Sequence, residues 1–554
     1  AGRLGAEVLA PLNASGDRQG CVFENGAVRV PDGFVDAYRR FVEGGWNGLA
    51  FPTDYGGQGL PCPLATDVGD IWSAANMQFA ICPLLTGSAT KLLLRHGDAR
   101  MRAAYLPKLV SGEWTGTMLL TEAPAGSDLA RVRTKAVPDG DHFRISGQKI
   151  FVTYGEHDPA PNIIHAVLAR TPSAPDGVRG LSLFLVPKFL PKEDGRLGAR
   201  NDLRCVSIEH KLGINASPTA VMSFGDDQGA VGFLIGEENR GLDLMFTMMN
   251  NARMAVGLEG VGIADRAFQQ ARGYAFERIQ GRRLGGTDPD AVAIVRHPDV
   301  QRMLLTMKSQ TEAARALAYY TAAALDAARR HPDEKARRRR QRLVDLLTPV
   351  VKAWCTDIGI DVADTAIQVH GGIGYIEESG VPQFLRDARI AAIYEGTNGI
   401  QAMDLVGRKV AGDDGSAVRE LIAAIFSADA DLAAVGDPDV QAIRPRLRRA
   451  AADLAGATDW LLATYSRDPS RTAAGAVLYL RLLGNVTAGW LMTAAASRSG
   501  ARLARSGDES RFLSAKLKSA RYFADTRLAE SSSLRGKFIT AGDALQGFDP
   551  EMHL

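Results

Sequence analysis

Residues 120–128 read Leu120-Thr121-Glu122-Ala123-Pro124-Ala125-Gly126-Ser127-Asp128 and mark the place where the sequence changes its pattern. Before this segment, apolar residues recur at helical spacing, as in Ala89 to Leu94 and in Met101 to Val110. After it, short apolar runs alternate with Gly, Pro and Asp, which is typical of strands joined by turns. The residue types of the segment itself favour an ordinary Ser/Asp turn over a ligand-binding loop.

The strand pattern continues to about Glu237 and then ends. The runs expected to form strands are His142 to Ile145, Ile163 to Leu168, Leu181 to Val186 and Thr219 to Phe224. Helical patterns return after Gly241 and are broken by Gly412-Asp413-Asp414-Gly415.

The predicted class is therefore mainly α with a central β-domain, a barrel or sandwich. The predicted domains are an N-terminal helical domain (1–115), a middle β-domain (116–240), a helical bundle (241–412) and an additional C-terminal helical domain (413–554).

The composition argues against a nucleic-acid partner, a metal site and a membrane span. The 554 residues include 65 Lys and Arg and 63 Asp and Glu, so the net charge is only +2 and no nucleic-acid partner is expected. The five cysteines have neither metal-ligand nor redox spacing, which predicts reduced thiols in a cytoplasmic protein and no metal site. No uninterrupted apolar run reaches membrane-spanning length, so no membrane span is expected.

Two further segments are candidates for ligand contacts. In Gly147-Gln148-Lys149-Ile150-Phe151-Val152-Thr153, a turn is expected to lead into a short strand; its aromatic residue, Phe151, could stack on a planar ring but is more often core. In Gln368-Val369-His370-Gly371-Gly372-Ile373-Gly374-Tyr375, the glycine backbone could cradle a pyrophosphate. His370 by itself favours a hydrogen-bonded structural histidine.

The last candidate is a carboxylate at the end of an apolar run. It lies in Ile390-Ala391-Ala392-Ile393-Tyr394-Glu395-Gly396-Thr397-Asn398-Gly399-Ile400-Gln401. An apolar setting raises the pKa of a carboxylate and makes Glu395 a better general base. An exposed glutamate at a helix end is an equally good interpretation of the same residues.

Taken in order, these segments resemble the acyl-CoA dehydrogenase family. Thr121 to Asp128 is similar to the Thr-Glu-Pro-x-Ala-Gly-Ser-Asp signature of the family, with Ala123 in place of the first proline. Tyr394 to Gln401 resembles the second signature, which surrounds the catalytic glutamate. The resemblance covers residues 1 to about 410. It is greatest to long bacterial members with an added C-terminal helical domain, in particular the 3-(methylthio)propanoyl-CoA dehydrogenases.

The resemblance implies FAD as cofactor and assigns roles to individual residues. Glu395 would be the catalytic base. The residues implied in FAD binding are Met118, Leu120, Thr121, Ser127, Phe151, Thr153, Arg278, Gln280, Gln368, Gly371, Gly372 and Thr397. Of these, Arg278, Gln280 and the residues from Gln368 to Gly372 would reach the FAD phosphates of a neighbouring subunit. The residues implied in acyl-CoA binding are Ser127, Asn250, Arg253, Tyr394 and Gly396.

The implied reaction is α,β-dehydrogenation of an acyl-CoA to a trans-2-enoyl-CoA, as in fatty acid β-oxidation, with hydride transfer to flavin N5. The implied partners are an electron-transfer flavoprotein and a second copy of the chain, with a tetramer still open.

Three alternatives stay open. The first is an acyl-CoA oxidase. The second is a DNA-associated flavoprotein on the same scaffold, suggested by the run Lys335 to Arg342, although such a run is usually a solvated helix face. The third is a peripheral membrane role for residues 415–554, for which a dimer-completing role is the simpler interpretation.

Overall fold

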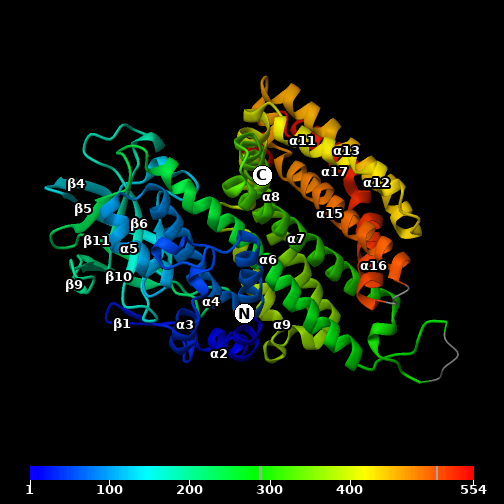
Figure 1. The fold of residues 1–554 in the computed structure, drawn as a ribbon, viewed down its shortest axis with the longest axis horizontal. Helices are drawn as coiled ribbons and strands as arrows, with labels where there is room; N and C mark the ends of the chain where they lie inside the picture. The colour runs from blue at the N-terminus through cyan, green and yellow to red at the C-terminus, as the bar shows by residue number, and fades with distance from the viewer. Residues whose placement is uncertain (286–289, 507–509) are drawn as a thin grey trace. The chain divides into compact units, whose positions relative to one another are not determined.

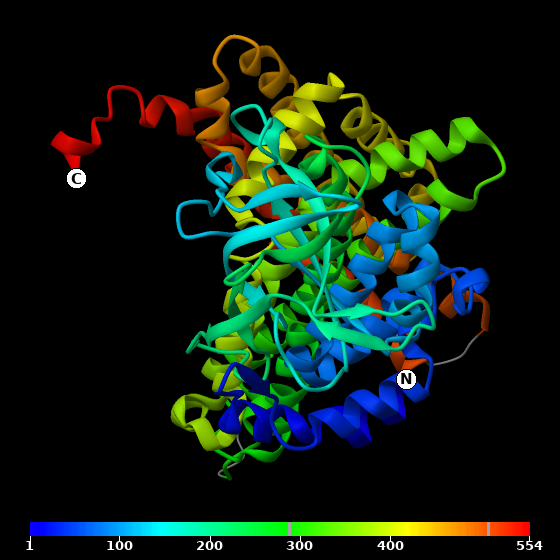
Figure 2. The same cartoon turned by 90° about the vertical axis from the view of Figure 1, so that its left-hand side faces the viewer.

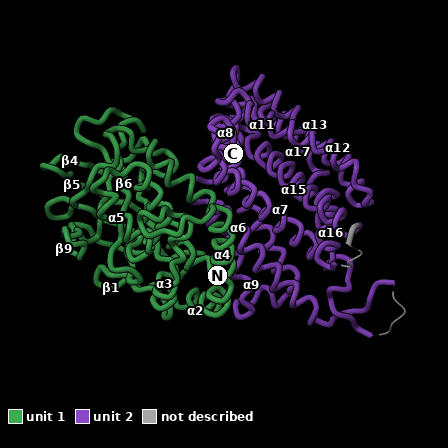
Figure 3. Tube along the Cα trace, in the orientation of Figure 1, with its two compact units in different colours: residues 1–255 green, residues 256–554 purple. Residues whose placement is uncertain are grey.

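The computed structural model describes residues 1–285, 290–506 and 510–554. The chain folds into two compact units, Ala1–Ala255 (unit 1) and Val256–Leu554 (unit 2), which are coloured separately in Figure 3. The boundary falls inside helix α6 (Gly241–Glu277). The boundaries between the four predicted domains are not tested by this two-unit division and stay a prediction.

Unit 1 begins with helices that pack on one another and on the sheet that follows. Asp98 caps the last of them by accepting a hydrogen bond from the Met101 N–H at 2.7 Å, and Gly112 ends it with a φ of 83°. The helices of unit 1 before α6 are α1 (Gly2–Leu4), α2 (Pro11–Gln19), α3 (Phe34–Glu43), α4 (Cys62–His96) and α5 (Ala99–Ser111).

A short hairpin interrupts the N-terminal helices. Strands β1 (Val22–Glu24) and β2 (Ala27–Arg29) pair through a turn at Asn25 and Gly26, whose φ values are 51° and 78°. Asn-Gly is a strong signal for a two-residue hairpin turn, because both central residues need a positive φ. The expectation of a mainly helical segment missed this hairpin.

Helix α4 is long and apolar, with 35 residues. Among the described residues it is the one helix long and apolar enough to cross a membrane, although no such span was expected from the sequence. Within the structure, 72% of its most apolar 18-residue window is buried, and the helix packs on β3 and α5. These contacts are those of a core helix.

The central β-domain is one twisted sheet, visible in Figures 1 and 2. Within unit 1, which the structure describes in full, eight strands pair in the order β10-β11-β5-β12-β7-β6-β3, and β4 pairs with β5. Pairing is antiparallel except between β3 and β6. The strand bounds are β3 (Thr115–Leu119), β4 (Lys135–Asp139), β5 (His142–Thr153), β6 (Ile163–Ala169), β7 (Ser182–Pro187), β10 (Leu203–Ile208), β11 (Thr219–Phe224) and β12 (Ala230–Leu234), with a separate β8 (Phe189–Pro191) and β9 (Leu197–Arg200) hairpin.

Unit 2 is helical throughout its described residues. After α6 its helices are α7 (Pro298–Arg330), α8 (Glu334–His370), α9 (Val381–Ala391), α10 (Asn398–Asp404), α11 (Ser416–Ser427), α12 (Asp429–Ala433), α13 (Pro438–Tyr465), α14 (Pro469–Ala473), α15 (Ala476–Ser506), α16 (Arg511–Thr526), α17 (Ser531–Ala544) and α18 (Pro550–His553). Helices α7 and α8 form an antiparallel pair, and α13, α15, α16 and α17 pack together (Figure 1). Trp354 of α8 donates to Asn485 Oδ1 of α15 at 2.9 Å, so the C-terminal helices are tied to the bundle.

Helices α6 and α8 approach each other closely because glycines face each other at the contact. A Cβ built on Gly260 would lie 2.4 Å from the carbonyl oxygen of Cys355, and one on Gly359 would lie 2.9 Å from the Gly260 Cα. Side chains at these positions would separate the two backbones. The contact therefore fixes the position of α6 residues next to Gly260 relative to α8.

Candidate active site

The predicted base lies in the turn between α9 and α10. Glu395 has a φ of +58°, which is uncommon for a residue other than glycine, and Gly396 follows with a φ of +83°. The Asn398 N–H closes the turn by donating to the Ala392 carbonyl at 3.0 Å, and the Thr397 hydroxyl caps α10 by accepting from the Ile400 N–H. Strained backbone of this kind persists where the surrounding structure holds it, and it is frequent at active sites.

Two fully buried side chains hold this turn through its carbonyl groups. Lys352 of α8 donates from Nζ to the Gly396 carbonyl at 2.8 Å and to Asn398 Oδ1 at 2.9 Å. Gln401 of α10 donates from Nε2 to the Glu395 carbonyl at 3.0 Å. A buried donor left without these acceptors would be costly, so the turn and its supports stabilise one another.

Asn398 extends the support to a second carboxylate. Its Nδ2 donates to Asp357 Oδ1 at 2.7 Å and to the Thr356 hydroxyl at 3.0 Å. Burial raises the pKa of Asp357, and the hydrogen bond from Asn398 opposes that effect. Helix α8 thus contributes three polar side chains, Lys352, Thr356 and Asp357, that hydrogen-bond to the turn that carries Glu395.

The side chain before the base is also held from within unit 2. Tyr394 is half-buried, and its hydroxyl donates a short hydrogen bond to Oε2 of Glu259, a fully buried residue of α6. Tyr394, Glu395, Gly396 and Thr397 are therefore brought together, as the sequence predicts. Glu259 and Lys352 were missed.

The glycine-rich segment has the shape expected of a phosphate cradle. Gly371, with a φ of +62°, ends α8, and the 3-10 helix η7 (Gly371–Tyr375) follows. A Cβ built on Gly371 or Gly372 would meet nothing within 4 Å, so a ligand can approach this backbone closely, and Gln368 is exposed beside it.

His370 has a structural role here. Its Nδ1 lies 2.7 Å from the Ala366 carbonyl, and its ring stacks on Tyr274 with centroids 4.4 Å apart. Burial lowers the pKa of His370. The hydrogen-bonded structural histidine favoured by residue type is confirmed.

Arg278 and Gln280 lie just beyond α6, on an exposed segment. Arg278 Nη2 donates to Gln280 Oε1 at 3.2 Å, and the Gln280 N–H donates to the Val292 carbonyl at 3.0 Å. Their predicted contact with the FAD of a neighbouring subunit stays a prediction.

In unit 1, a buried ion pair fixes the loop that begins the Thr121 to Asp128 signature. Lys149 of β5 donates from Nζ to Glu122 Oε1 at 2.8 Å and to the Leu120 carbonyl at 3.1 Å, and the Ile150 N–H donates to the Thr121 carbonyl at 3.0 Å. Burial lowers the pKa of Lys149 to about 8, although the Glu122 charge opposes this effect.

Glu122 is the anchor of this loop. Burial acts to raise its pKa, but the Lys149 charge and hydrogen bonds from Lys149, Thr134 and the Arg133 N–H outweigh burial, and the pKa is lowered. Glu122 thus positions the neighbouring Thr121 and Leu120.

Phe151 is not a core residue, and the more frequent interpretation of its residue type is wrong. It has a φ of +57° and a side chain that is 60% exposed. The register between β11 and β5 shifts here, since Ala220 faces Val152 whereas Met222 faces Lys149. This bulge adds a residue to β5 and turns Phe151 out of the sheet, as bulges near binding sites do.

The remaining unit 1 candidates lie on β3, β5, the signature loop and α6. The Thr117 hydroxyl of β3 donates to the Thr153 carbonyl at 2.7 Å, which ties the strand that carries Met118 to the end of β5. Ser127 is exposed on the signature loop. Arg253, buried in α6, donates to Asn250 Oδ1 at 3.2 Å, so this predicted pair is in contact.

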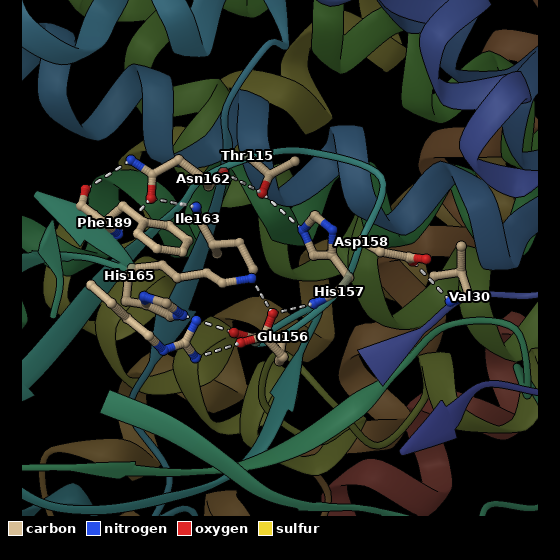
Figure 4. Close-up of polar contacts among 12 residues, drawn as sticks. Val30, Thr115, Glu156, His157, Asp158, Asn162, Ile163, His165 and Phe189 are labelled. Atoms are coloured by element: carbon tan, nitrogen blue, oxygen red, sulfur yellow. Dashed lines mark hydrogen bonds and ion pairs between the residues drawn. The ribbon is translucent and has the colours of Figure 1, made fainter. Parts of the chain in front are cut away.

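A polar network that the sequence did not predict fixes the loop after β5 (Figure 4). The Glu156 carboxylate is buried and pairs with Lys188 and, at 3.4 Å, with Arg200. His157 Nε2 lies 2.9 Å from the Thr115 hydroxyl of β3, and burial lowers the pKa of His157 to about 3, so the ring is neutral. The network holds the end of β5, where Thr153 lies, against β3.

The features of these two groups of residues fit FAD. In unit 1, β5 carries an exposed aromatic ring at Phe151, on which an isoalloxazine ring could stack, and the end of β5 is hydrogen-bonded to β3, the strand that carries Met118. In unit 2, an open glycine backbone is available for a pyrophosphate.

Arginines of the run from Lys335 to Arg342 form ion pairs with glutamates of the same chain. Arg338 pairs with Glu334, and both Arg339 and Arg342 pair with Glu420, at 2.5, 2.9 and 2.7 Å. These contacts fit a solvated helix face rather than a nucleic-acid surface.

Comparison with known families assigns most of the chain. Residues 6–113, 117–226 and 239–410 match models described as the acyl-CoA dehydrogenase N-terminal, middle and C-terminal domains. Residues 417–547 match a model described as acetyl-CoA dehydrogenase C-terminal like.

Individual relatives agree with the family models. The chain is 49% identical over 545 residues to the 3-methylmercaptopropionyl-CoA dehydrogenase of Ruegeria pomeroyi, covering 98% of this chain and 92% of that protein. It is 33% identical over 568 residues to the broad-specificity linear acyl-CoA dehydrogenase FadE5 of Mycobacterium tuberculosis, covering 99% and 92%.

A solved acyl-CoA dehydrogenase from Bacillus anthracis, complexed with FAD, shares the fold. It has a TM-score of 0.77 at 21% identity and covers 98% of this chain and 88% of that chain. From the family matches and the long relatives, the chain belongs to the acyl-CoA dehydrogenase family and is a FAD-dependent oxidoreductase that acts on an acyl-CoA.

Proposed function

We propose that this enzyme oxidises an acyl-CoA thioester to the trans-2-enoyl-CoA, with Glu395 as the base that removes the α-proton. The observation that carries the proposal is the conformation of Glu395. It has a φ of +58°, and buried donors from α8 and α10 hold the carbonyl groups of Glu395 and Gly396. A side chain that only covered the end of a helix would not need such support.

The residues of the turn account for proton removal. The Glu395 carboxylate takes the proton from the α-carbon, while the Glu395 backbone N–H donates to the thioester carbonyl and stabilises the negative charge that develops there. Bound FAD supplies the acceptor for the hydride that leaves the β-carbon. Loss of the α-proton and the β-hydride leaves the double bond between the two carbons.

Lys352 and Gln401 do not touch the substrate in this scheme. They hold the Glu395 and Gly396 carbonyls, so that the carboxylate keeps one orientation toward the α-carbon. Positioning of this kind lowers the barrier because the reacting groups need no further ordering.

For the substrate, we propose 3-(methylthio)propanoyl-CoA, supported by 49% identity over 98% of the chain to a dehydrogenase named for that thioester. Short-, medium- or long-chain acyl-CoAs are the competing outcomes. We further propose an electron-transfer flavoprotein as electron acceptor, a homodimer as the assembly, with a tetramer as the alternative, and a cytoplasmic location.

The experiment that tests this function is anaerobic mixing of the purified flavoprotein with a panel of acyl-CoAs, followed at the visible absorbance maximum of the flavin. Rapid bleaching with one chain class supports the dehydrogenation and ranks the substrates. Absence of bleaching with every thioester contradicts it. Hydrogen peroxide production at the full turnover rate in air identifies an oxidase instead.

A further inference from the structure

A second carboxyl group, on α6, contacts the residue that precedes the proposed base. Glu259 of α6 is fully buried, and its Oε2 accepts the short hydrogen bond from the Tyr394 hydroxyl, directly before Glu395 in the chain. Its Oε1 is buried and has no hydrogen-bond partner among the described residues. A buried carboxyl with one unsatisfied oxygen is costly and calls for an explanation.

Close packing of α6 against α8 fixes the backbone position of Glu259. Its neighbours Gly257 and Gly260 face α8, and a Cβ on Gly257 would lie 2.6 Å from Val351 Cγ1. The α6 backbone therefore lies against α8 on either side of Glu259 in the sequence. Glu259 is therefore held in place relative to α8, the helix that carries Lys352.

The charged groups around this contact come from three elements. Tyr394 and Glu395 face Glu259 from the turn, and Lys352 faces it from α8. Asp387 of α9 acts on Tyr394 from the other side. Burial, with a smaller effect from the Glu395 charge, raises the pKa of Glu259 to about 8, against the lowering effects of the Tyr394 hydrogen bond and Lys352.

We propose that Glu259 is a positioning residue for Glu395: through the Tyr394 hydroxyl it anchors the N-terminal side of the turn that carries the base. This inference rests on the proposed role of Glu395. Lys352 and Gln401 hold the carbonyls of Glu395 and Gly396, whereas Glu259 holds the side chain before them, so the turn is fixed from both sides.

The arrangement has a consequence for pH dependence. Near neutral pH, Glu259 is mainly protonated and adds no charge. As the pH rises through about 8, Glu259 ionises, and its negative charge increases the proton affinity of the adjacent Glu395. The rate constant for flavin reduction should therefore change in a step near pH 8 that depends on Glu259.

The test compares Glu259→Ala, Glu259→Gln, Tyr394→Phe and the Glu259→Ala/Tyr394→Phe double variant, each purified with FAD. The readouts are the rate constant for flavin reduction by saturating acyl-CoA from pH 6 to pH 9.5, and the melting temperature. We expect Glu259→Ala to reduce flavin about 10- to 100-fold more slowly, because a misplaced base loses its alignment. Glu259→Gln, which keeps an acceptor for Tyr394, should recover about tenfold of that loss and lack the step near pH 8.

Tyr394→Phe should match Glu259→Ala, and the double variant should be no slower than either single one, because both remove the same link. A matched control is Glu312→Ala, which removes a carboxyl of α7 that pairs with Lys308 and Lys516. It should change the melting temperature but leave the step near pH 8 in place.

The outcomes separate this inference from the function on which it rests. If Glu395→Gln abolishes reduction while both Glu259 variants keep the wild-type rate and pH profile, the positioning role is refuted and the base assignment stands. If Glu259→Ala lowers only the melting temperature, its role is structural and the inference is also wrong. If Glu395→Gln reduces flavin at the wild-type rate, the proposed function itself fails.

Discussion

Lys352 is fully buried, and its Nζ lies 2.8 Å from the carbonyl oxygen of Gly396, 44 positions later in the chain. A buried ammonium group needs acceptors for its protons, and here two of them belong to the turn that carries Glu395. The position of the base is thus tied to a charged residue in the middle of an otherwise apolar stretch of α8.

Replacing Lys352 by methionine should impair both the turn and catalysis. Methionine fills a similar volume but leaves the Gly396 carbonyl and Asn398 Oδ1 with only their longer hydrogen bonds, at 3.3 and 3.4 Å, at a cost of about 1–3 kcal/mol in the free energy of unfolding. We expect flavin reduction to slow by about 100-fold, as for other small misplacements of a base. Lys516→Met, which removes a lysine paired with Glu312, is the control. A wild-type reduction rate in Lys352→Met would show that the turn does not depend on this contact.

The ion pair between Glu122 and Lys149 should be far more important for stability than a pair on the surface. Glu122→Gln leaves a buried ammonium without its counter-ion and should lower the free energy of unfolding by about 3 kcal/mol. Glu113→Gln breaks the exposed pair with Lys108 and should change it by less than about 1 kcal/mol. Urea unfolding measures both. Equal effects would contradict the anchoring role of Glu122.

Replacing Phe151 by glycine should change cofactor binding and stability in opposite directions. Its side chain is 60% exposed and its φ is positive, so glycine at this position relieves backbone strain and should stabilise the apoprotein by about 0.5–1 kcal/mol. Loss of the ring should nevertheless weaken FAD binding by about tenfold, measured by flavin release during dialysis. Phe512→Ala, which removes a phenylalanine that is 70% exposed on α16, should leave FAD affinity unchanged. Equal affinity in Phe151→Gly would exclude contact with the flavin.

Two glycines of α6 give opposite expectations for the same substitution. Gly260→Ala places a methyl group 2.4 Å from the Cys355 carbonyl, and separating α6 from α8 should cost about 1–3 kcal/mol. At Gly273, nothing lies within 4 Å of an added Cβ, so Gly273→Ala should stabilise the protein by up to about 1 kcal/mol. Thermal melting of the two variants is sufficient. A stabilised Gly260→Ala would show that the helices tolerate a wider separation.

The fold was predictable where local pattern decides it. The strand expected at Thr219 to Phe224 has those bounds in the structure, and the strands expected at Ile163 and Leu181 differ from the observed ones by a residue. The sequence predicts a strand at His142 to Ile145, then a turn and a short strand within Gly147 to Thr153, whereas β5 runs without interruption from His142 to Thr153. Its second half contains Lys149, which is buried only because Glu122, 27 positions earlier, provides a counter-ion.

The candidate site was predictable only in part, for a similar reason. Glu395 and its neighbours form one continuous motif, so the sequence places them together. Glu259 and Lys352 stand far from that motif in the chain, and only the packing of α6, α8 and the turn brings them to it. A signal existed, since each is a lone charge in an apolar, small-residue stretch: Val256-Gly257-Leu258-Glu259-Gly260-Val261 and Val350-Val351-Lys352-Ala353-Trp354.

The most direct test of the central claim is the rate constant for flavin reduction in Glu395→Gln, measured anaerobically by stopped flow with the best thioester of the panel. Glutamine keeps the shape of the side chain but cannot take a proton at neutral pH. We predict that the variant retains FAD, binds the acyl-CoA and reduces its flavin about 10⁴-fold more slowly than the wild type. Reduction at the wild-type rate would contradict the assignment of Glu395 as the base.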